Sequence, residues 1–296
     1  MYEQISSNIW KSWGLLFVFV AIVAAIGVVF WHSTNSPWAV PIAVTVAVVM
    51  AVGSYYNSDK IILAMSGARP AEKPEFAHLI NSVEGLAIAA GLPTPRVYVI
   101  DDSAPNAFAT GRDPQHAVIC VTTGLVEKMD RVELEGVIGH EMSHVKNYDI
   151  RFAMLVVVMV GIVALLSDWL LRSLWWGGGR GSSDDDEDRG SGAIWMVVAV
   201  VVAILAPISA VLMQAALSRQ REFLADANGA LLTRYPQGLA SALEKIAADS
   251  EPLEAANKAT AALYIYNPLK DIGGKVNSLF DTHPPIEERV RRLRAM

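Results

Sequence analysis

The pattern with the clearest chemical meaning is His140-Glu141-Met142-Ser143-His144, in which two histidines stand four residues apart. Residues four apart stack on one face of a helix, so the two imidazoles can bind one small cation. Glu141 lies about 100° around such a helix and can reach a water molecule beside the cation without becoming a ligand. The spacing predicts a zinc site at which Glu141 acts as a general base. The alternative is a pair of surface histidines that share a helix face by chance.

Two histidines do not complete a catalytic zinc site, which usually has three protein ligands and one water. Glu222 and Asp226 stand four apart in a later helical stretch, so one can bind the metal while the other orients a ligand imidazole. Spacing alone leaves these two roles open, and an ordinary surface pair of acids has the same spacing. Asp149, five residues after His144, is a further candidate partner. His283 precedes two prolines that could aim its ring into a cleft, although a lone histidine there is more often a loop residue.

The histidine pair lies inside a stretch with the signals of a capped helix. Asp130 is followed three residues later by Glu133, which completes a capping box, and the helix is expected to run to about Tyr148. Three strand-like runs precede it, and two other stretches have apolar residues at helical spacing. We therefore expect an α+β, mainly helical domain with helices at 72–90, 130–148 and 218–232 and a small β-sheet from strands at 96–100, 107–110 and 116–121.

The composition indicates an integral membrane protein. The chain has 296 residues, of which 53% are hydrophobic and 18% charged, against about 25% charged in an average soluble domain. A helix needs about 20 apolar residues to cross the hydrocarbon core. The first apolar segment is too long for a signal peptide and is followed closely by a second. Buried core helices of a soluble protein are the alternative, and Asp168 and Pro207 leave open whether the later pair spans fully. The four segments lie at 13–31, 38–56, 152–171 and 193–217.

Charges beside these segments set their orientation. Nine Lys and Arg residues flank one side and three flank the other, which places both termini and residues 57–151 in the cytoplasm. The acidic loop at 177–192 then lies outside, and its run of acids at 184–188 indicates a solvated linker rather than a calcium site. The net charge of −6 gives no basic surplus for binding nucleic acid. The single cysteine, Cys120, excludes an intramolecular disulfide and a zinc site built on several cysteines.

These signals divide the chain into membrane and cytoplasmic parts that alternate. Two spans anchor the chain, a first cytoplasmic part carries the histidine pair, a second membrane hairpin follows, and a second cytoplasmic part carries the remaining ligand. The expected boundaries are 1–56, 57–151, 152–217 and 218–296.

Four ordered motifs resemble the HtpX family of membrane zinc metalloproteases and, more distantly, the CAAX prenyl proteases. They are the 140–144 pattern with Asp149, and the runs at 218–226, 106–111 and 282–289. The resemblance covers nearly the whole chain, with the acidic loop as the main region outside it. It implies a zincin-like, gluzincin-type domain that binds one zinc ion per chain, with Glu222 as the third ligand and Asp226 as its hydrogen-bonding partner. It also implies protein substrates.

The resulting expectation is an endopeptidase of the cell inner membrane that acts in protein quality control and the stress response. Its substrates would be unfolded, damaged or misassembled membrane proteins, cleaved on the cytoplasmic side. The ligands follow or precede apolar segments by a few residues, so the site should lie within roughly 10–15 Å of the bilayer surface. Asn106 and the run at 107–110 could hold an extended substrate at a sheet edge. His283 or Arg289 could support the oxyanion or the fold.

Three other functions compete with this one. A scaffold with structural zinc needs a closed site of four protein ligands, yet the chain has one cysteine and would leave Glu141 without a purpose. A metal transporter would place ionisable ligands near the bilayer midplane, whereas all candidates lie outside the apolar segments. A catalytically inactive protease would lack a metal ligand or the general base, whereas this sequence contains a candidate for each of them.

Overall fold

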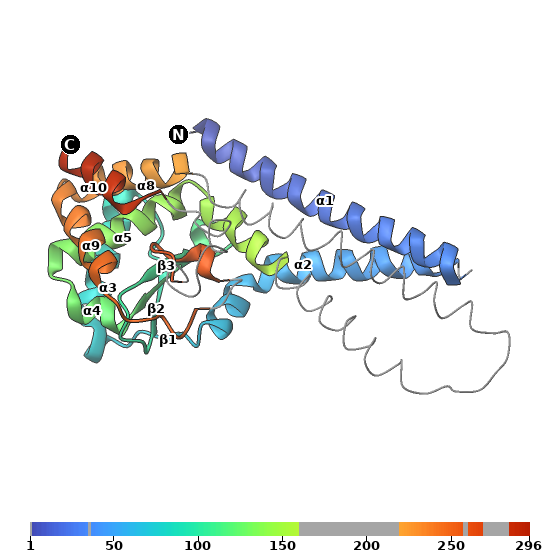
Figure 1. Cartoon of the computed structure of the whole chain (residues 1–296), viewed down its shortest axis with the longest axis horizontal. Helices are drawn as coiled ribbons and strands as arrows, with labels where there is room; N and C mark the ends of the chain where they lie inside the picture. The colour runs from blue at the N-terminus through green and yellow to red at the C-terminus, as the bar shows by residue number, and fades with distance from the viewer. Residues whose placement is uncertain (1, 35–36, 160–218, 257–259, 269–283) are drawn as a thin grey trace.

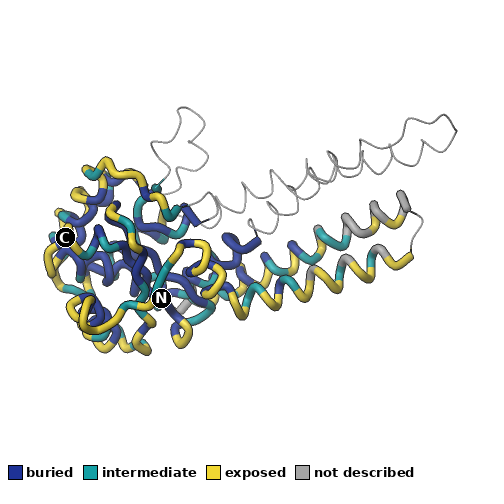
Figure 2. Tube along the Cα trace, turned by 90° about the horizontal axis from the view of Figure 1, so that it is seen from below, coloured by how far each residue is buried: buried dark blue, intermediate teal, exposed yellow. Residues whose placement is uncertain are grey.

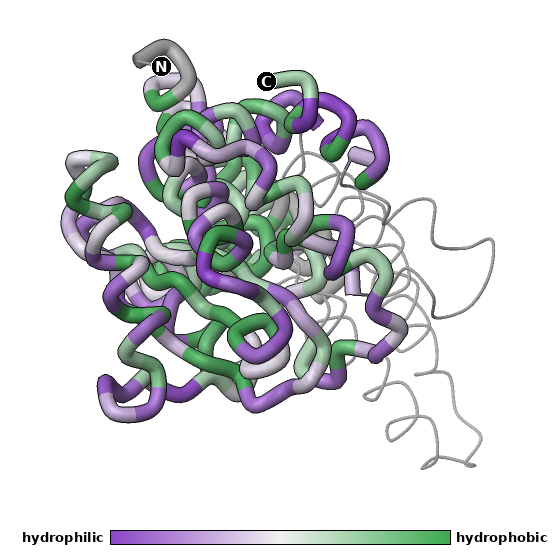
Figure 3. The backbone as a smooth tube through the Cα atoms, turned by 90° about the vertical axis from the view of Figure 1, so that its left-hand side faces the viewer, coloured by the Kyte–Doolittle hydropathy of each residue, from purple (hydrophilic) through white to green (hydrophobic). Residues whose placement is uncertain are grey.

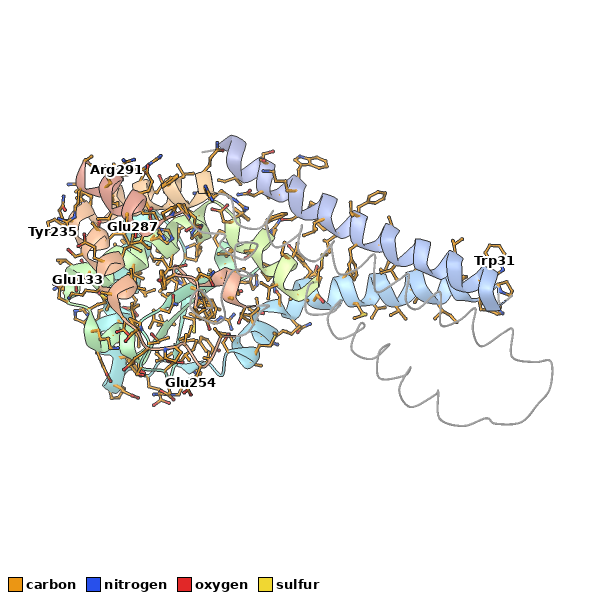
Figure 4. All side chains as sticks on the ribbon, viewed as in Figure 1. Trp31, Glu133, Tyr235, Glu254, Glu287 and Arg291 are labelled. Atoms are coloured by element: carbon orange, nitrogen blue, oxygen red, sulfur yellow. The ribbon has the colours of Figure 1, made fainter. Side chains whose placement is uncertain are left out.

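A long helical hairpin projects from a globular part (Figure 1). The computed structural model describes residues 2–34, 37–159, 219–256, 260–268 and 284–296. The hairpin consists of α1 (Tyr2–Thr34) and α2 (Ala39–Met65), and the N-terminal end of α1 lies beside the globular part. Figure 4 shows Trp31 at the far tip of the hairpin and Arg291 at the opposite end of the molecule. The described part is mainly helical with a small sheet, which confirms that part of the predicted fold class.

The sheet has four strands in the order β1-β2-β4-β3. β2 (Arg96–Ile100) runs parallel to β4 (Val118–Thr122). The two-residue β1 (Arg69–Pro70) and β3 (Ala107–Thr110) pair antiparallel to them at the two edges. β2 and β4 are rich in Val and Ile, as expected for pleated, buried segments. The strands predicted at 96–100 and 107–110 are confirmed, whereas β1 is absent from the prediction because Arg-Pro carries no strand signal.

The strand predicted at 116–121 begins later in the structure. Residues 114–116 form a 3₁₀ turn, η1 (Pro114–His116), because the Asp113 carboxylate accepts a hydrogen bond from the His116 backbone N–H at 2.9 Å. Pro114 also suits the first position of a helical turn. β4 therefore starts at Val118, and the prediction was wrong for its first two residues.

Side chains of the sheet alternate between two apolar layers. Ile119 and Val121 pack in a layer with α3 (Lys73–Ala90) and α5 (Arg131–Lys146). Val118 and Cys120 pack in the other layer, which contains the base of the hairpin and residues 152–159. The sheet thus joins the helices of the globular part to the hairpin. The buried hairpin side chains in that second layer are Leu15, Phe19, Ile62 and Leu63.

A capping box determines the start of α5, and a change of backbone conformation determines its end. The Glu133 backbone N–H donates to the Asp130 side chain and the Asp130 backbone N–H donates to the Glu133 side chain, both at 2.9 Å, so the predicted capping box is present. The helix ends at Lys146, two residues before the predicted end. Tyr148 there adopts the left-handed conformation with φ of 60°, which closes the helix and sends the chain into a second helical stretch at 149–159.

The remaining helices of the described chain surround α5. The helices predicted at 72–90 and 218–232 are confirmed as α3 and as α8 (Arg219–Thr233). Seen from the end away from the hairpin, the globular part shows hydrophilic segments interleaved with hydrophobic ones, as expected of a water-exposed surface (Figure 3). The other elements are α4 (Thr123–Lys128), α9 (Pro236–Ala248), the 3₁₀ turn η2 (Ala261–Leu263) and α10 (Ile286–Arg294).

Figure 2 shows exposed residues along the hairpin, and many of them are large and apolar. Trp10, Phe17 and Trp38 are exposed by 74%, 76% and 69%. Among the described residues, one helix, Val40–Met65, is long and apolar enough to cross a membrane, and 6% of its most apolar window is buried. A buried core helix of a soluble protein would not show such low burial. Ile5–Ala21 is a shorter apolar helix. The prediction of four spans is therefore not confirmed, and residues 160–218 with the acidic loop lie outside the described chain.

α2 continues past the expected boundary at residue 56 and enters the globular part. Ile62 and Leu63 are buried there. Asp59 forms a salt bridge to Arg96 of β2, with 2.5 Å between its Oδ2 and the arginine Nη2. One continuous helix therefore connects the hairpin to the sheet.

Candidate metal centre

His140 and His144 lie one turn apart on α5, with their rings facing the same space. Their centroids are 4.8 Å apart, their planes are nearly perpendicular, and their Nε2 atoms are separated by 3.2 Å. Glu222 of α8 approaches both rings, with Oε2 at 3.6 Å from His140 Nε2 and Oε1 at 3.5 Å from His144 Nε2. Within the described chain, these are the side chains grouped closely enough to hold a metal ion.

A close crossing of α5 and α8 brings Glu222 to the histidines. Gly139 and Gly229 face each other at this crossing, and a methyl group on Gly229 would lie 2.9 Å from the His140 backbone nitrogen. Only glycine allows the two backbones to come so near. Glu222 is two helical turns before Gly229, so the position of its carboxylate depends on this contact.

Asp226 and Arg289 form a buried ion pair that contacts His140 through its Nδ1. This Nδ1 lies 2.9 Å from Asp226 Oδ1. Arg289 donates to both oxygens of the same carboxylate, from Nε at 2.9 Å and from Nη2 at 2.6 Å, and a third bond runs from Nη1 to the Ile265 carbonyl at 3.1 Å. Burial favours protonation of Asp226, but the charge and hydrogen bonds of Arg289 outweigh it and lower the carboxyl pKa to about 2. Asp226 therefore stays ionised and keeps a proton on His140 Nδ1.

His144 is held in the same way by a second carboxylate. Its Nδ1 lies 3.1 Å from Asp149 Oδ2. Burial opposes protonation of His144, but the hydrogen bond to Asp149 and the charge of Glu222 outweigh it and raise the imidazole pKa to about 9 in the metal-free chain. Both rings thus direct Nε2 toward Glu222 while Nδ1 is committed to a carboxylate.

This donor set fits a tetrahedral metal ion. Bonds of about 2.0–2.1 Å to nitrogen and oxygen place the ligand atoms of such an ion about 3.3 Å apart. The observed separations between the two Nε2 atoms and the Glu222 oxygens run from 3.2 to 3.6 Å. Two imidazole nitrogens and a carboxylate that face one another at these distances are suited to holding a cation between them.

Glu141 lies beside this group and lines the same cleft. Its carboxyl is buried and accepts a hydrogen bond from the Ala109 backbone, and burial raises its pKa to about 7. A carboxyl with such a pKa can take and return a proton near neutral pH. The cleft is also lined by Ile150, Ala153, Arg221, Leu263, Tyr264 and Ile265.

Comparison with known proteins settles the family. The family model described as Peptidase family M48 matches residues 73–296. The chain belongs to peptidase family M48. A protease HtpX homolog from Dictyoglomus thermophilum is 49% identical over 297 residues, which span 100% of this chain and 94% of the relative. A second protease HtpX homolog, from Streptococcus gordonii, is 44% identical over 299 residues that span 100% of both chains.

A solved structure shares the fold of this M48 member. The crystal structure of S. mikatae Ste24p superposes with a TM-score of 0.50 over 99% of this chain and 67% of the other, at 20% sequence identity. The resemblance to the HtpX family, and the more distant one to the CAAX proteases, are therefore confirmed. As an M48 member the chain is a metallopeptidase, and His140, His144 and Glu222 are the described group in which its metal fits.

Asn106 is placed within the fold rather than in the cleft. It is buried, and its side-chain amide donates to the Tyr266 carbonyl at 3.0 Å. The next residue of β3, Ala107, accepts from the Ile265 backbone N–H at 2.9 Å, so the segment at 264–266 covers this end of the sheet edge. Ala109, further along β3, lines the cleft instead. The part of the β3 edge that remains for the predicted substrate contact is therefore the stretch around Ala109.

Arg289 is fully buried, at 0% exposure, behind Asp226 and away from the cleft lining. Of the two roles left open for it, support of the fold or of the oxyanion, its contacts favour the first. His283 lies outside the described residues. One contact absent from the sequence prediction is Asn8 of α1, whose side chain donates to Asp149 Oδ1 at 2.7 Å. Its only signal is a polar residue just before an apolar segment.

Proposed function

We propose that the chain is a membrane-anchored zinc metalloendopeptidase that cleaves misfolded or damaged membrane proteins on the cytoplasmic side of the cell inner membrane. The observation that carries this proposal is the convergence of His140, His144 and Glu222 in one cleft with Glu141 beside them. Two imidazoles and one carboxylate are a donor set typical of catalytic zinc. Three protein ligands would leave one position of a tetrahedral ion for water or substrate, as hydrolysis requires.

Each residue of the site has a role in this reaction. His140, His144 and Glu222 would hold the ion, while Asp226 and Asp149 would fix the tautomer and orientation of the two imidazoles. Zinc, when bound, makes water nucleophilic near neutral pH and polarises the scissile carbonyl. Glu141 takes the proton from the attacking water and passes it to the leaving amine. An extended substrate backbone would lie along Ala109 at the edge of β3.

The membrane location follows from the hairpin and the spacing along the chain. The exposed apolar side chains of α1 and α2 support a membrane anchor. Phe152 starts an apolar segment eight residues after His144, and Glu222 follows another by five residues. At ~1.5 Å per helical residue, the metal centre would lie within roughly 10–15 Å of the bilayer surface. The distribution of Lys and Arg beside the apolar segments supports a cytoplasmic location of both termini and the site.

The test is proteolysis of an unfolded protein by the detergent-purified full chain. We expect cleavage that a zinc chelator abolishes and that added zinc restores, with magnesium as the matched control that restores nothing. Cleavage that persists after the metal has been removed, as measured by elemental analysis, would overturn the proposal.

A further inference from the structure

Asn8 connects α1 to the site through two buried hydrogen bonds. Its side-chain amide donates to Asp149 Oδ1 at 2.7 Å and to the Asn147 carbonyl at 2.9 Å. An asparagine amide has two donor hydrogens, so both are used. Asn8 is 4% exposed, whereas Trp10, two residues later on the same helix, is 74% exposed. The Asn8 face of α1 therefore rests on the globular part and the opposite face does not.

The two acceptors are the parts of the chain that determine where Asp149 lies. Asp149 Oδ2 is the hydrogen-bonding partner of His144, and Oδ1 accepts from Asn8 at 2.7 Å, with Arg221 Nη1 further away at 3.7 Å. Asn147 and the left-handed Tyr148 form the turn that folds Asp149 back toward α5. A left-handed turn at a tyrosine has a conformational cost that its surroundings must offset. Asn8 thus fixes both the Asp149 carboxylate and the turn that carries it.

A helix that only anchored the chain would have little use for a buried amide. Burying a polar side chain costs free energy unless its hydrogen bonds are made. Here they are made, and both go to the segment that orients a ligand imidazole. Hydrogen-bonding partners of this kind influence metal affinity even though they do not touch the metal.

We propose that Asn8 is a positioning residue of the metal centre, acting through Asp149 on His144. This inference rests on the proposed zinc peptidase function. It makes the first turns of α1 part of the catalytic apparatus, so that the membrane hairpin and the metal centre are coupled through one side chain. Displacement of α1 from the globular part would release Asp149 and lower activity without removing a metal ligand.

The experiment compares single and double variants of the full chain in detergent. Zinc affinity is measured by competition with a chromogenic chelator, and kcat and KM are measured on an unfolded protein. Asn8→Ala is compared with Ser12→Ala, a matched change one turn along α1. Ser12 is also buried, but its hydroxyl donates within the helix, to the Asn8 carbonyl at 2.8 Å. Asp149→Ala and the double variant Asn8→Ala/Asp149→Ala complete the set.

We expect Asn8→Ala to weaken zinc binding by about 10–100-fold and to lower kcat with KM unchanged, while Ser12→Ala stays within about twofold of wild type. In the Asp149→Ala background, Asn8→Ala should have no further effect on zinc affinity, because the residue through which it acts is gone. If the two losses multiply in the double variant, or if Asn8→Ala binds zinc like Ser12→Ala, the proposal is overturned. Failure of the zinc peptidase function itself would appear separately, as a wild-type chain that neither binds zinc nor cleaves.

Discussion

His140 and His144 look equivalent in the sequence but differ in charge in the structure. Burial lowers the pKa of His140, whereas Asp149 and Glu222 overcome burial at His144 and raise its pKa to about 9. Arg289, whose Nη2 lies 3.4 Å from His140 Nδ1, also opposes protonation of that ring, whereas the carboxylates of Asp149 and Glu222 favour protonation of His144. The metal-free centre at neutral pH therefore holds one neutral and one protonated imidazole. Metal binding has to displace that proton.

Zinc affinity is accordingly expected to rise with pH up to about 9. Below that pH, His144 carries a proton in the metal-free chain, and loss of one proton per bound ion changes the apparent affinity about tenfold per pH unit. Chelator competition between about pH 6.5 and 8.5 measures this slope. Asp149→Asn is the control, since removing the carboxylate lowers the His144 pKa and moves the dependence to lower pH. An affinity independent of pH over this range would contradict the assigned protonation.

Site residues could be predicted from the sequence where two of them lie one turn apart on the same helix. The pairs at 140 and 144 and at 222 and 226 each lie on one helix face, and the structure brings both pairs together. Arg289 and Asn8 could not be placed in this way, because they contact residues 63 and 141 positions away in the chain. Periodicity carries no information about such contacts. The same limit applies to Asn106, whose amide binds a loop 160 positions later.

The crossing of α5 and α8 determines whether the site exists. Gly139 and Gly229 let the helices approach, and α9 crosses α5 at a comparable contact between Gly136 and Leu239. Three helices thus meet at positions where a side chain would not fit. Caps and apolar spacing in the sequence predicted the individual helices. Their crossing could not be predicted, because a glycine inside a helix indicates only a less stable helix until the residue packed against it is known.

Gly229→Ala is expected to destabilise the fold and to weaken zinc binding. The new methyl group would lie 2.9 Å from the His140 backbone, so α8 must move and carry Glu222 with it. Overpacking of this kind costs about 1–3 kcal/mol in the free energy of unfolding. Chemical denaturation and zinc stoichiometry are the measurements.

Gly85→Ala provides the matched control for this change. Gly85 lies in α3 with no atom within 4 Å of an added methyl group. Alanine there should raise the free energy of unfolding by about 0.5–1 kcal/mol and leave zinc binding unchanged. Equal effects of the two substitutions would show that the contact between α5 and α8 does not position Glu222.

The molecule as a whole connects a long apolar hairpin to a hydrolytic centre. α2 enters the globular part and packs on the sheet, and α1 reaches the metal site through Asn8. Composition and charge predicted a membrane anchor and a cytoplasmic active part, and the exposed apolar hairpin agrees with the anchor. How the two parts join could not be predicted, since it depends on buried contacts between residues far apart in the chain.

Cleavage of membrane proteins is expected in the segments outside the bilayer. At the proposed location, within roughly 10–15 Å of the membrane surface, the centre would reach cytoplasmic loops and tails but not the hydrocarbon core. Reconstitution of the chain with a destabilised membrane protein in liposomes, followed by mass spectrometry of the products, locates the cuts. The Glu141→Gln variant serves as the blank. Cuts confined to the middle of membrane spans would contradict this location.

The assignment of the site is tested most directly by measuring zinc content and cleavage on the same preparations of three chains. Wild type should hold one zinc ion and cleave an unfolded protein. Glu141→Gln should retain the zinc but cleave about 10²–10⁴-fold more slowly, because it lacks the general base. Glu222→Ala should lose both the zinc and the cleavage. Full cleavage by Glu141→Gln, or one tightly bound zinc ion in Glu222→Ala, would contradict the assigned base or the assigned third ligand.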